Sequence, residues 1–114
     1  MLVTESYSRR CAITGERTLP VLDAAHIKPY SVVHRHDVSN GLLLRSDLHT
    51  LFDQGYLSVD PKDKRVMVSH RIKDEFENGR DYYRLEGQLL REPGPAWAKP
   101  SIENLEYHAR EVFH

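Results

Sequence analysis

Asp23-Ala-Ala-His26-Ile-Lys-Pro29 is the most informative segment of this chain, and Asn40 and His49 follow it along the sequence. Asn40 lies fourteen positions after His26, and His49 lies nine positions after Asn40. We expect this span to form a β-hairpin followed by a helix. One imidazole can then deprotonate a water molecule, the amide can fix the loop that carries it, and the second imidazole can hold a metal ion against a phosphate oxygen. The set fits a one-metal phosphodiesterase site.

The composition is that of an ordinary globular protein. Of the 114 residues, 39% are hydrophobic and 29% are charged, which suits one domain with one modest core. No apolar run approaches the roughly 20 residues of a membrane span, and the start of the chain lacks the basic and apolar regions of a signal peptide. The single cysteine, Cys11, excludes an intramolecular disulfide. We therefore expect a cytoplasmic protein with no membrane partner.

The charge balance bears on nucleic-acid binding. Sixteen basic and seventeen acidic residues give a formal net charge of −1, whereas free-standing nucleic-acid binders are usually basic. A local patch is still enough, because each phosphate contact acts over about one Debye length, roughly 8–10 Å. Basic residues do lie in or near the informative segment: Arg9, Arg10, Lys28, Arg35 and Arg45. Near-neutral charge lowers the expected affinity for bare DNA and indicates a fused or associated domain that delivers the chain to its target.

Hydrophobic patterning predicts a strand, a loop and a second strand around the informative segment. Leu19–Ile27 is apolar with few interruptions, so we expect a strand that ends at His26. Tyr30–Ser39 is polar and rich in histidine, which indicates a surface loop. Asn40-Gly41 is a typical turn dipeptide, and Leu42–Arg45 is the expected return strand.

A helix and a second hairpin are expected next. Ser46 is the predicted N-cap, Asp47 in the first turn suits the helix dipole, and Gly55 is the predicted end of the helix. Tyr56–Asp60 and Arg65–Ser69 alternate as strands around a turn. These elements predict an α+β fold.

The last part of the chain is less regular. Residues 71–92 are ambiguous, with a short helix around Ile72–Glu77 and a loop or strand near Leu85–Leu90. Pro93–Pro100 is an extended connector, and Ser101 is the predicted N-cap of a final helix. The apolar face expected on that helix consists of Ile102, Leu105, Ala109, Val112 and Phe113.

Four segments, taken together and in order, resemble the motifs of one known family: Cys11-Ala-Ile-Thr-Gly15, Ala24-Ala-His-Ile-Lys-Pro29, Asn40-Gly-Leu-Leu-Leu44 and His49-Thr-Leu-Phe-Asp-Gln-Gly55. The set is similar to the HNH endonucleases of the ββα-metal class. The resemblance covers residues 11–60, and weaker similarity extends it at Leu105, His108 and Val112-Phe113. It implies a single nuclease domain over residues 1–114, with a motif core at 11–60 and a C-terminal elaboration at 61–114.

Carried over residue by residue, the resemblance implies roles for three side chains. His26 corresponds to the general base, which takes a proton from water in line with the scissile phosphorus. Asn40 corresponds to the residue that holds the loop by backbone hydrogen bonds and so orients the base. His49 corresponds to a metal ligand on the helix. The implied cofactor is one divalent metal ion, and the implied products are 3′-hydroxyl and 5′-phosphate ends.

The metal ligands are where this sequence departs from the family pattern. Many members carry Asp or His immediately before the base, and here that position is Ala25. Asp23, on the same strand face, and Asp53, four residues after His49 on the helix, are the alternative ligands. One imidazole with oxygen ligands and water suits Mg²⁺ or Mn²⁺ best, although Ni²⁺, Co²⁺ and Zn²⁺ also accept such ligands.

The resemblance also bears on structural zinc and on DNA contacts. Some relatives use a Cys-x-x-Cys pair in a four-cysteine zinc site, but here Thr14 replaces the second cysteine and Cys11 stands alone, so no structural zinc is expected. We expect Lys28, Arg35 and Arg45 to contact the phosphate backbone of DNA with weak sequence specificity.

Two functions remain open on the sequence alone. The first is a metal-dependent DNA endonuclease that nicks one strand per site, as a monomer or homodimer, and serves as the cleavage module of a restriction-type system. The second is a catalytically inactive DNA-binding module that retains the fold. Ala25 and the near-neutral charge favour the second, whereas the intact His26, Asn40 and His49 favour the first.

Overall fold

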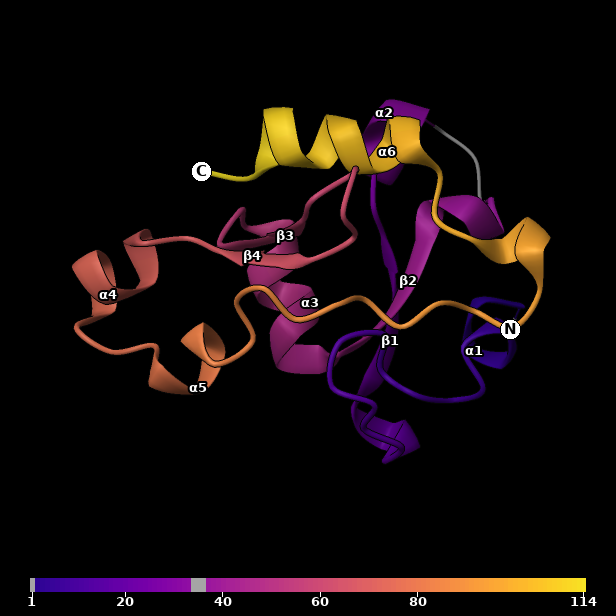
Figure 1. Ribbon diagram of the computed structural model, residues 1–114, viewed down its shortest axis with the longest axis horizontal. Helices are drawn as coiled ribbons and strands as arrows, with labels where there is room; N and C mark the ends of the chain where they lie inside the picture. The colour runs from indigo at the N-terminus through magenta and orange to yellow at the C-terminus, as the bar shows by residue number, and fades with distance from the viewer. Residues whose placement is uncertain (1, 34–36) are drawn as a thin grey trace.

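A β-hairpin and the helix that follows it lie at the centre of the molecule. In the computed structural model, strand β1 (Leu22–His26) pairs antiparallel with β2 (Gly41–Arg45), and His26 lies opposite Gly41. Helix α3 (Ser46–Asp53) begins directly after β2 and lies beside the hairpin (Figure 1). The expected α+β fold with a ββα unit is confirmed.

Strand β1 is shorter than the sequence predicts. Its expected first residues form a 3₁₀ turn, η1 (Leu19–Val21), which is closed by a 3.0 Å hydrogen bond from the Val21 N–H to the Thr18 carbonyl. Pro20 explains the difference, because its ring fixes φ in the helical range and it has no N–H to donate to a partner strand.

The segment between the two strands contains a short helix where a loop was expected. Helix α2 (Tyr30–Val33) starts immediately after Pro29, and its first turn hydrogen-bonds back to the Pro29 carbonyl. Proline is well tolerated at a helix start, because the missing N–H would have no partner there. The structure describes residues 2–33 and 37–114, so residues 34–36, Arg35 among them, lie outside the described part.

The Asn40-Gly41 pair does not form the expected turn. Asn40 ends a 3₁₀ turn, η2 (Val38–Asn40), and Gly41 is already in extended conformation, at φ −123°. Glycine is needed here for space, since a Cβ atom at position 41 would lie 2.6 Å from a methyl carbon of Val3. Because Gly41 has no side chain, β2 can start in close contact with Val3 of the N-terminal segment.

Helix α3 ends as predicted but starts one residue earlier, because Ser46, the predicted N-cap, is already its first helical residue. Arg45 occupies the N-cap position, and the Ser46 hydroxyl donates to the carbonyl that ends η1, at 3.1 Å. At the other end Gly55 has φ +82°, and the Tyr56 N–H bonds to the Leu51 carbonyl at 2.9 Å. This glycine-dependent C-terminal motif turns the chain sharply into the next strand.

The additional hairpin is present as expected. Strands β3 (Leu57–Val59) and β4 (Val66–Val68) pair antiparallel in a sheet of their own. In the turn between them, the Asp60 carboxylate accepts the backbone N–H groups of Lys62 and Asp63, at 2.8 and 3.1 Å. Asparagine and aspartate commonly stabilise turns in this way.

Two short helices follow the second hairpin and extend to one side of the molecule, at the left of Figure 1: α4 (Arg71–Phe76) and α5 (Arg80–Tyr83). The chain then returns across the molecule, with an isolated bridge between Arg65 and Leu89. A further short helix that the sequence did not predict, α1 (Leu2–Ser6), lies at the opposite end.

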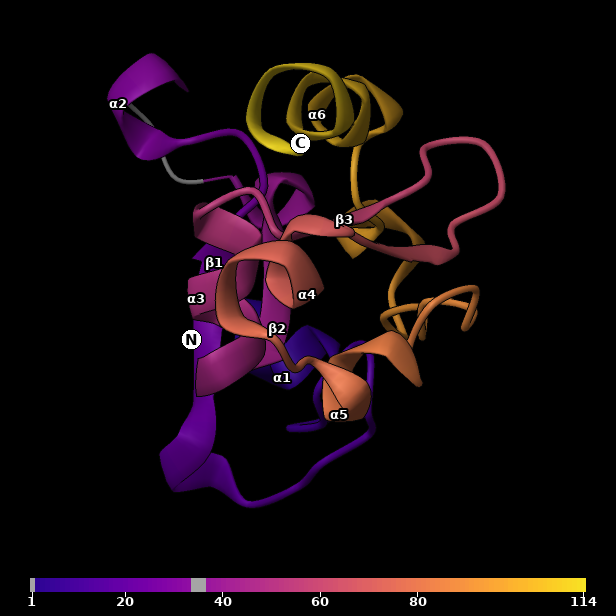
Figure 2. The same ribbon diagram turned by 90° about the vertical axis from the view of Figure 1, so that its left-hand side faces the viewer.

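The C-terminal helix covers the end of the molecule where α2 also lies (Figure 2). It follows a 3₁₀ turn, η3 (Ala96–Ala98), and consists of α6 (Ile102–Tyr107) and a π-helical turn, η4 (His108–Val112). Ser101 caps it as predicted, accepting the Asn104 N–H at 3.3 Å. The predicted apolar face is partly wrong.

Within that face Leu105 is buried, but Ile102 is 58% exposed, and His108 takes the other buried position. Because Leu105 and His108 are three residues apart, they lie on the same side of the helix. The buried face is therefore partly polar, which apolar patterning alone does not detect.

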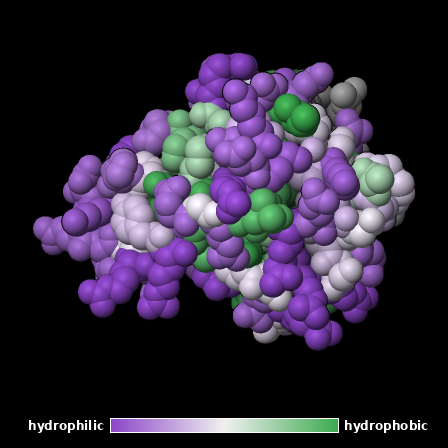
Figure 3. Space-filling model, in the orientation of Figure 1, coloured by the Kyte–Doolittle hydropathy of each residue, from purple (hydrophilic) through white to green (hydrophobic). Residues whose placement is uncertain are grey.

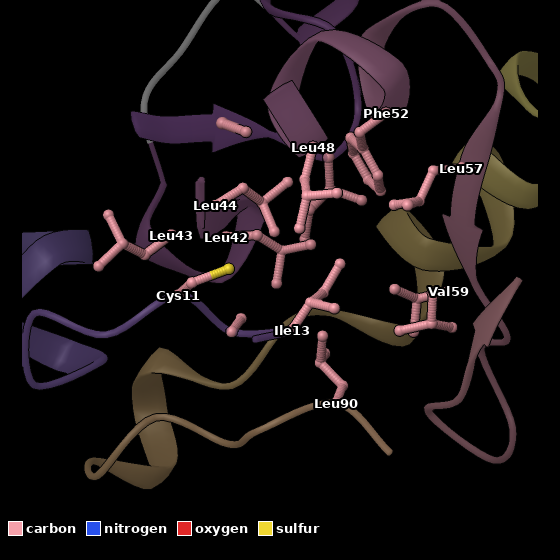
Figure 4. Packing of buried hydrophobic residues seen from close by; sticks show 14 of the residues in the cluster. Cys11, Ile13, Leu42, Leu43, Leu44, Leu48, Phe52, Leu57, Val59 and Leu90 are labelled. Atoms are coloured by element: carbon pink, nitrogen blue, oxygen red, sulfur yellow. The ribbon is translucent and has the colours of Figure 1, made fainter. Parts of the chain in front are cut away.

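The main core lies between α3, the first hairpin and the second hairpin (Figure 4). Strand β2 is buried along almost its whole length, and α3 contributes two fully buried side chains on the same face. The largest fully buried residues include Ile13, Leu42, Leu43, Leu44, Leu48, Phe52, Leu57 and Val59. Truncating one such leucine to alanine typically costs about 2–5 kcal/mol, so this core fixes the position of α3.

The face of the molecule in Figure 3 is mainly hydrophilic, with separate apolar areas. Among the described residues, no helix is long enough and apolar enough to cross a membrane.

Candidate active site

His26 is the last residue of β1, and its side chain opens into a pocket of about 210 Å³. The pocket lies where the end of β1, the end of α3 and the C-terminal helix meet. It is lined by His26, Ile27, Pro29, Tyr30, His49, Asp53, His108 and Val112. The Tyr30 ring lies 5.6 Å from the His26 ring, centre to centre, at a tilt of 58°.

Asn40 clamps the backbone that follows the candidate base. Its side-chain oxygen accepts the Lys28 N–H at 2.8 Å, and its side-chain nitrogen donates to the Lys28 carbonyl at 2.9 Å. The Asn40 carbonyl also accepts the Ile27 N–H at 2.9 Å. Asn40 is only 2% exposed, so these bonds are shielded from competing water. The Asn40 side chain thereby holds the backbone on both sides of Lys28, two residues after His26.

His49 lies on the exposed side of α3 between two carboxylates. Its Nδ1 atom is 3.0 Å from Oδ2 of Asp23, on β1, and its Nε2 atom is 3.0 Å from Oδ2 of Asp53, one helical turn later. The packing of α3 on β1 provides the first contact, and the i to i+4 spacing of the helix provides the second. The three predicted metal-binding residues are therefore adjacent.

The surroundings of Asp53 alter its pKa. Partial burial raises its pKa above the ordinary value, and the neighbouring His49 and His26 oppose that rise. The influence of both imidazoles agrees with the position of Asp53 in the pocket lining beside them.

The donors fit a sparse divalent-metal site better than a dense one. In the described part of the chain, no three His, Cys, Asp or Glu side chains converge as a ready-made cluster. Ala25 is buried and has no donor atom, so the position before the base contributes no ligand. The imidazole and carboxylate groups around His49 are nevertheless ligands for divalent cations, with water able to complete the coordination.

Comparison with known proteins identifies the segment that carries this geometry. A family model described as HNH endonuclease matches residues 11–60, the span from Cys11 to the second hairpin. The resemblance of this segment to HNH endonucleases is thereby confirmed.

A solved structure shows the same fold over nearly the whole chain. The "Modification dependent TagI restriction endonuclease" is 23% identical in sequence, with a TM-score of 0.68 over 97% of this chain and 36% of that one. The present chain thus spans about a third of the length of that enzyme. No curated protein matches the sequence.

The basic residues predicted to contact DNA have different surroundings in this HNH fold. Lys28 lies beside the clamp, with its ammonium group 4.7 Å from the centre of the Tyr107 ring. Arg45 forms a bidentate ion pair with Asp47, at 2.7 and 3.0 Å, so its charge is largely compensated within the chain. Arg35 lies outside the described residues. Of the two that the structure describes, Lys28 is therefore the better placed for a phosphate contact near His26.

His108 also lines the pocket, although sequence patterning assigned it no role. Its Nε2–H donates to the Phe52 carbonyl at 2.8 Å, its Nδ1 is 2.7 Å from the Ser58 hydroxyl, and its ring stacks on the Phe52 ring at 3.6 Å. Burial lowers its pKa to about 4, although the bond to the carbonyl works in the opposite direction. The available signal was a histidine three residues after Leu105, on the buried side of the C-terminal helix.

Proposed function

We propose that this chain is a metal-dependent DNA endonuclease in which His26 is the general base. The observation that carries the proposal is the convergence of His26, His49 and Asp53 on one pocket, with Asn40 clamping the chain directly after His26. The family assignment supplies the reaction class, phosphodiester hydrolysis.

His26 would take a proton from a water molecule that attacks the phosphorus. A neutral imidazole has one ring nitrogen with a lone pair, which can accept that proton. Proton transfer also needs the base to be held at a fixed distance and angle from the water. Asn40 meets this need indirectly, because its two hydrogen bonds to Lys28 fix the chain two residues beyond the base.

His49, with one or both neighbouring carboxylates, would hold the divalent cation. When bound, that cation stabilises negative charge on the phosphate and on the leaving oxygen. We propose Mg²⁺ or Mn²⁺ as the physiological ion, because the neighbouring donors are carboxylate oxygens. Lys28 is the proposed contact to the DNA backbone.

One base per chain acts on one phosphodiester bond, so we propose that a monomer nicks one strand and leaves 3′-hydroxyl and 5′-phosphate ends. We further propose that residues 1–114 act as one nuclease domain, because His108 and Val112 from the C-terminal helix help to line the pocket. A chain with a single cysteine suits the cytoplasm.

The wider setting that we propose is a restriction-type system. The fold matches about a third of a larger restriction enzyme, and the net charge of −1 provides little general attraction to DNA. A fused or associated targeting domain would supply both affinity and specificity.

The decisive experiment is cleavage of supercoiled plasmid with Mg²⁺, Mn²⁺, Ni²⁺ or EDTA. Open-circle product that requires metal and is lost on His26→Ala would support the proposal. His70→Ala, at an exposed histidine just before α4 and outside the pocket lining, is the matched control and should cleave as the wild type does. Linear product at early times would indicate a dimer that cuts both strands.

The alternative is a DNA-binding module without activity, which Ala25 and the absence of a ready-made three-ligand cluster among the described residues favour. Under that alternative no metal would produce open circles, and His26→Ala would bind a labelled duplex as the wild type does. For an enzyme, the same variant would retain binding and lose cleavage.

A further inference from the structure

The two carboxylates that flank His49 do not occupy equivalent positions. Asp53 lines the pocket together with His26, whereas Asp23 is not part of that lining. Asp23 belongs to β1, where its backbone pairs with Leu44, and it contacts the Nδ1 side of the His49 ring. The Nε2 side of the ring is the side that faces Asp53 and the pocket.

The chemistry of imidazole connects the two sides. A neutral ring has one N–H and one nitrogen with a lone pair, and only the lone pair can bind a cation. A carboxylate next to the ring needs the N–H. If the cation is bound where His49 faces the pocket, the proton must lie on Nδ1, and Asp23 is the group that accepts it.

We propose that Asp23 is a positioning residue, which accepts the Nδ1–H of His49 and keeps the Nε2 lone pair directed toward Asp53 and the pocket. The inference rests on the proposed function, because it concerns the cation of that same site. It separates the two carboxylates that the sequence left as equal alternatives: Asp53 is a ligand and Asp23 is not.

The directions of the two ring nitrogens explain why Asp23 cannot fill both roles. The bonds that leave Nδ1 and Nε2 in the ring plane diverge, so a cation at Nε2 lies across the ring from the Asp23 oxygen that accepts the Nδ1–H. Histidine ligands in metal sites commonly donate their second N–H to a carboxylate, which fixes the tautomer and makes the ligand more basic. Asp23 is on β1, so its contact also ties the His49 ring to a second element of the fold.

The test uses Zn²⁺ as a diamagnetic probe of the full chain, without DNA. Long-range ¹H–¹⁵N spectra of the Zn²⁺-loaded protein show which ring nitrogen of His49 carries the metal and which carries the proton. The His49 signals are assigned by their loss in His49→Asn. We expect metal on Nε2 and the proton on Nδ1. Metal on Nδ1, or no shift of the His49 signals with Zn²⁺, would overturn the proposal.

Isosteric variants then separate positioning from ligation. Asp23→Asn should weaken Zn²⁺ binding by about 10- to 100-fold and leave the metal on Nε2, as expected for a group that hydrogen-bonds to a metal ligand but does not itself bind the metal. Asp53→Asn should also weaken binding while the proton stays on Nδ1. Asp63→Asn, an exposed site that loses the same charge, is the control for both. An Asp23→Asn affinity equal to that of Asp63→Asn would overturn the proposal, and thermal melting confirms that each variant is folded.

Plasmid cleavage distinguishes this inference from the proposed function. If the wild-type protein gives the expected Zn²⁺ spectra and affinities but never nicks DNA, the nuclease proposal fails and the role of Asp23 stands. If it nicks DNA but carries the metal on Nδ1, the nuclease stands and the role of Asp23 is wrong.

Discussion

His49 and His108 use both ring nitrogens, yet they lie in opposite surroundings. His49 is on the exposed side of α3, and both of its partners are carboxylates, Asp23 and Asp53. His108 is 1% exposed, and its partners are a backbone carbonyl and the Ser58 hydroxyl. The first ring can gain a proton or a cation without losing a partner. The His108 ring has one N–H and one lone pair, both already used in hydrogen bonds, and it is too buried to gain a proton or a cation.

The different partners of the two histidines suit different roles: His49 belongs to the proposed metal site, and His108 belongs to the core that supports it. Charged partners at the surface suit a group that binds a cation, whereas neutral partners in the core suit a group that must remain neutral. His108 connects the end of α3 to the second hairpin and the C-terminal helix, because Phe52 and Ser58 lie on either side of the Gly55 turn. Since Phe52 directly precedes Asp53, this connection also holds the proposed ligand in place.

The largest effect expected from this comparison is on activity. His49→Ala removes the imidazole that we propose as metal ligand. Because a bound cation contributes several kcal/mol of transition-state stabilisation, the cleavage rate should fall on the order of 10³-fold. The free energy of unfolding should change by less than about 1 kcal/mol, because the side chain is not in the core. Plasmid nicking rates and urea denaturation measure the two quantities. A variant that cleaves within a few-fold of the wild type would contradict the proposed role.

The ββα unit could be predicted because its signals are local. The apolar run of β2, the acidic first turn of α3 and Gly55 at its end each depend on residues within one or two turns of chain. Two details of the unit differ from the prediction, for steric reasons that hydrophobic patterning does not detect. Pro20 converts the start of β1 into a 3₁₀ turn, and Gly41 is required by the nearby Val3 side chain rather than by a turn.

The sequence predicted which residues form the site, but not how their side chains contact one another. Motif spacing indicated His26, Asn40 and His49, and the structure brings these residues or their contacts to one end of the hairpin. Spacing could not show which ring nitrogen of His49 faces Asp23, because that depends on how α3 packs on β1. It also gave no role to His108, whose partners Phe52 and Ser58 lie 56 and 50 residues away in sequence.

The second effect concerns stability. His108→Ala should lower the free energy of unfolding by about 3 kcal/mol, because it leaves a cavity beside Phe52 and removes the partner of two buried polar groups. Urea denaturation of the full chain measures it. His70→Ala is the matched control and should change stability by less than about 0.5 kcal/mol, because His70 is exposed. Equal stabilities for the two variants would show that the buried ring contributes no more than a surface one.

The third effect is a dependence on pH. The pKa of His108 is lowered to about 4 in the folded state, against about 6.5 when the chain unfolds. Below pH 6.5 the unfolded state therefore binds more protons, so the stability is complete above that pH and is lost as the pH falls toward 4. Between pH 7 and pH 5 this amounts to roughly 2 kcal/mol. His108→Gln cannot titrate, so the wild-type stability should fall by that much more than that of the variant over the same range.

The smallest expected effect is the loss of stability in Ser58→Ala, which tests how the neutral form of His108 is stabilised. Because its Nε2–H donates to the Phe52 carbonyl, its Nδ1 must accept the Ser58 hydroxyl proton, and Ser58→Ala leaves that buried nitrogen without a donor. The expected cost is about 1–2 kcal/mol in urea denaturation. In the double variant with His108→Ala, most of that cost should disappear, since the unsatisfied nitrogen is gone. Full additivity would mean that the two side chains act independently, and the neutral pair would then not be what holds the end of α3.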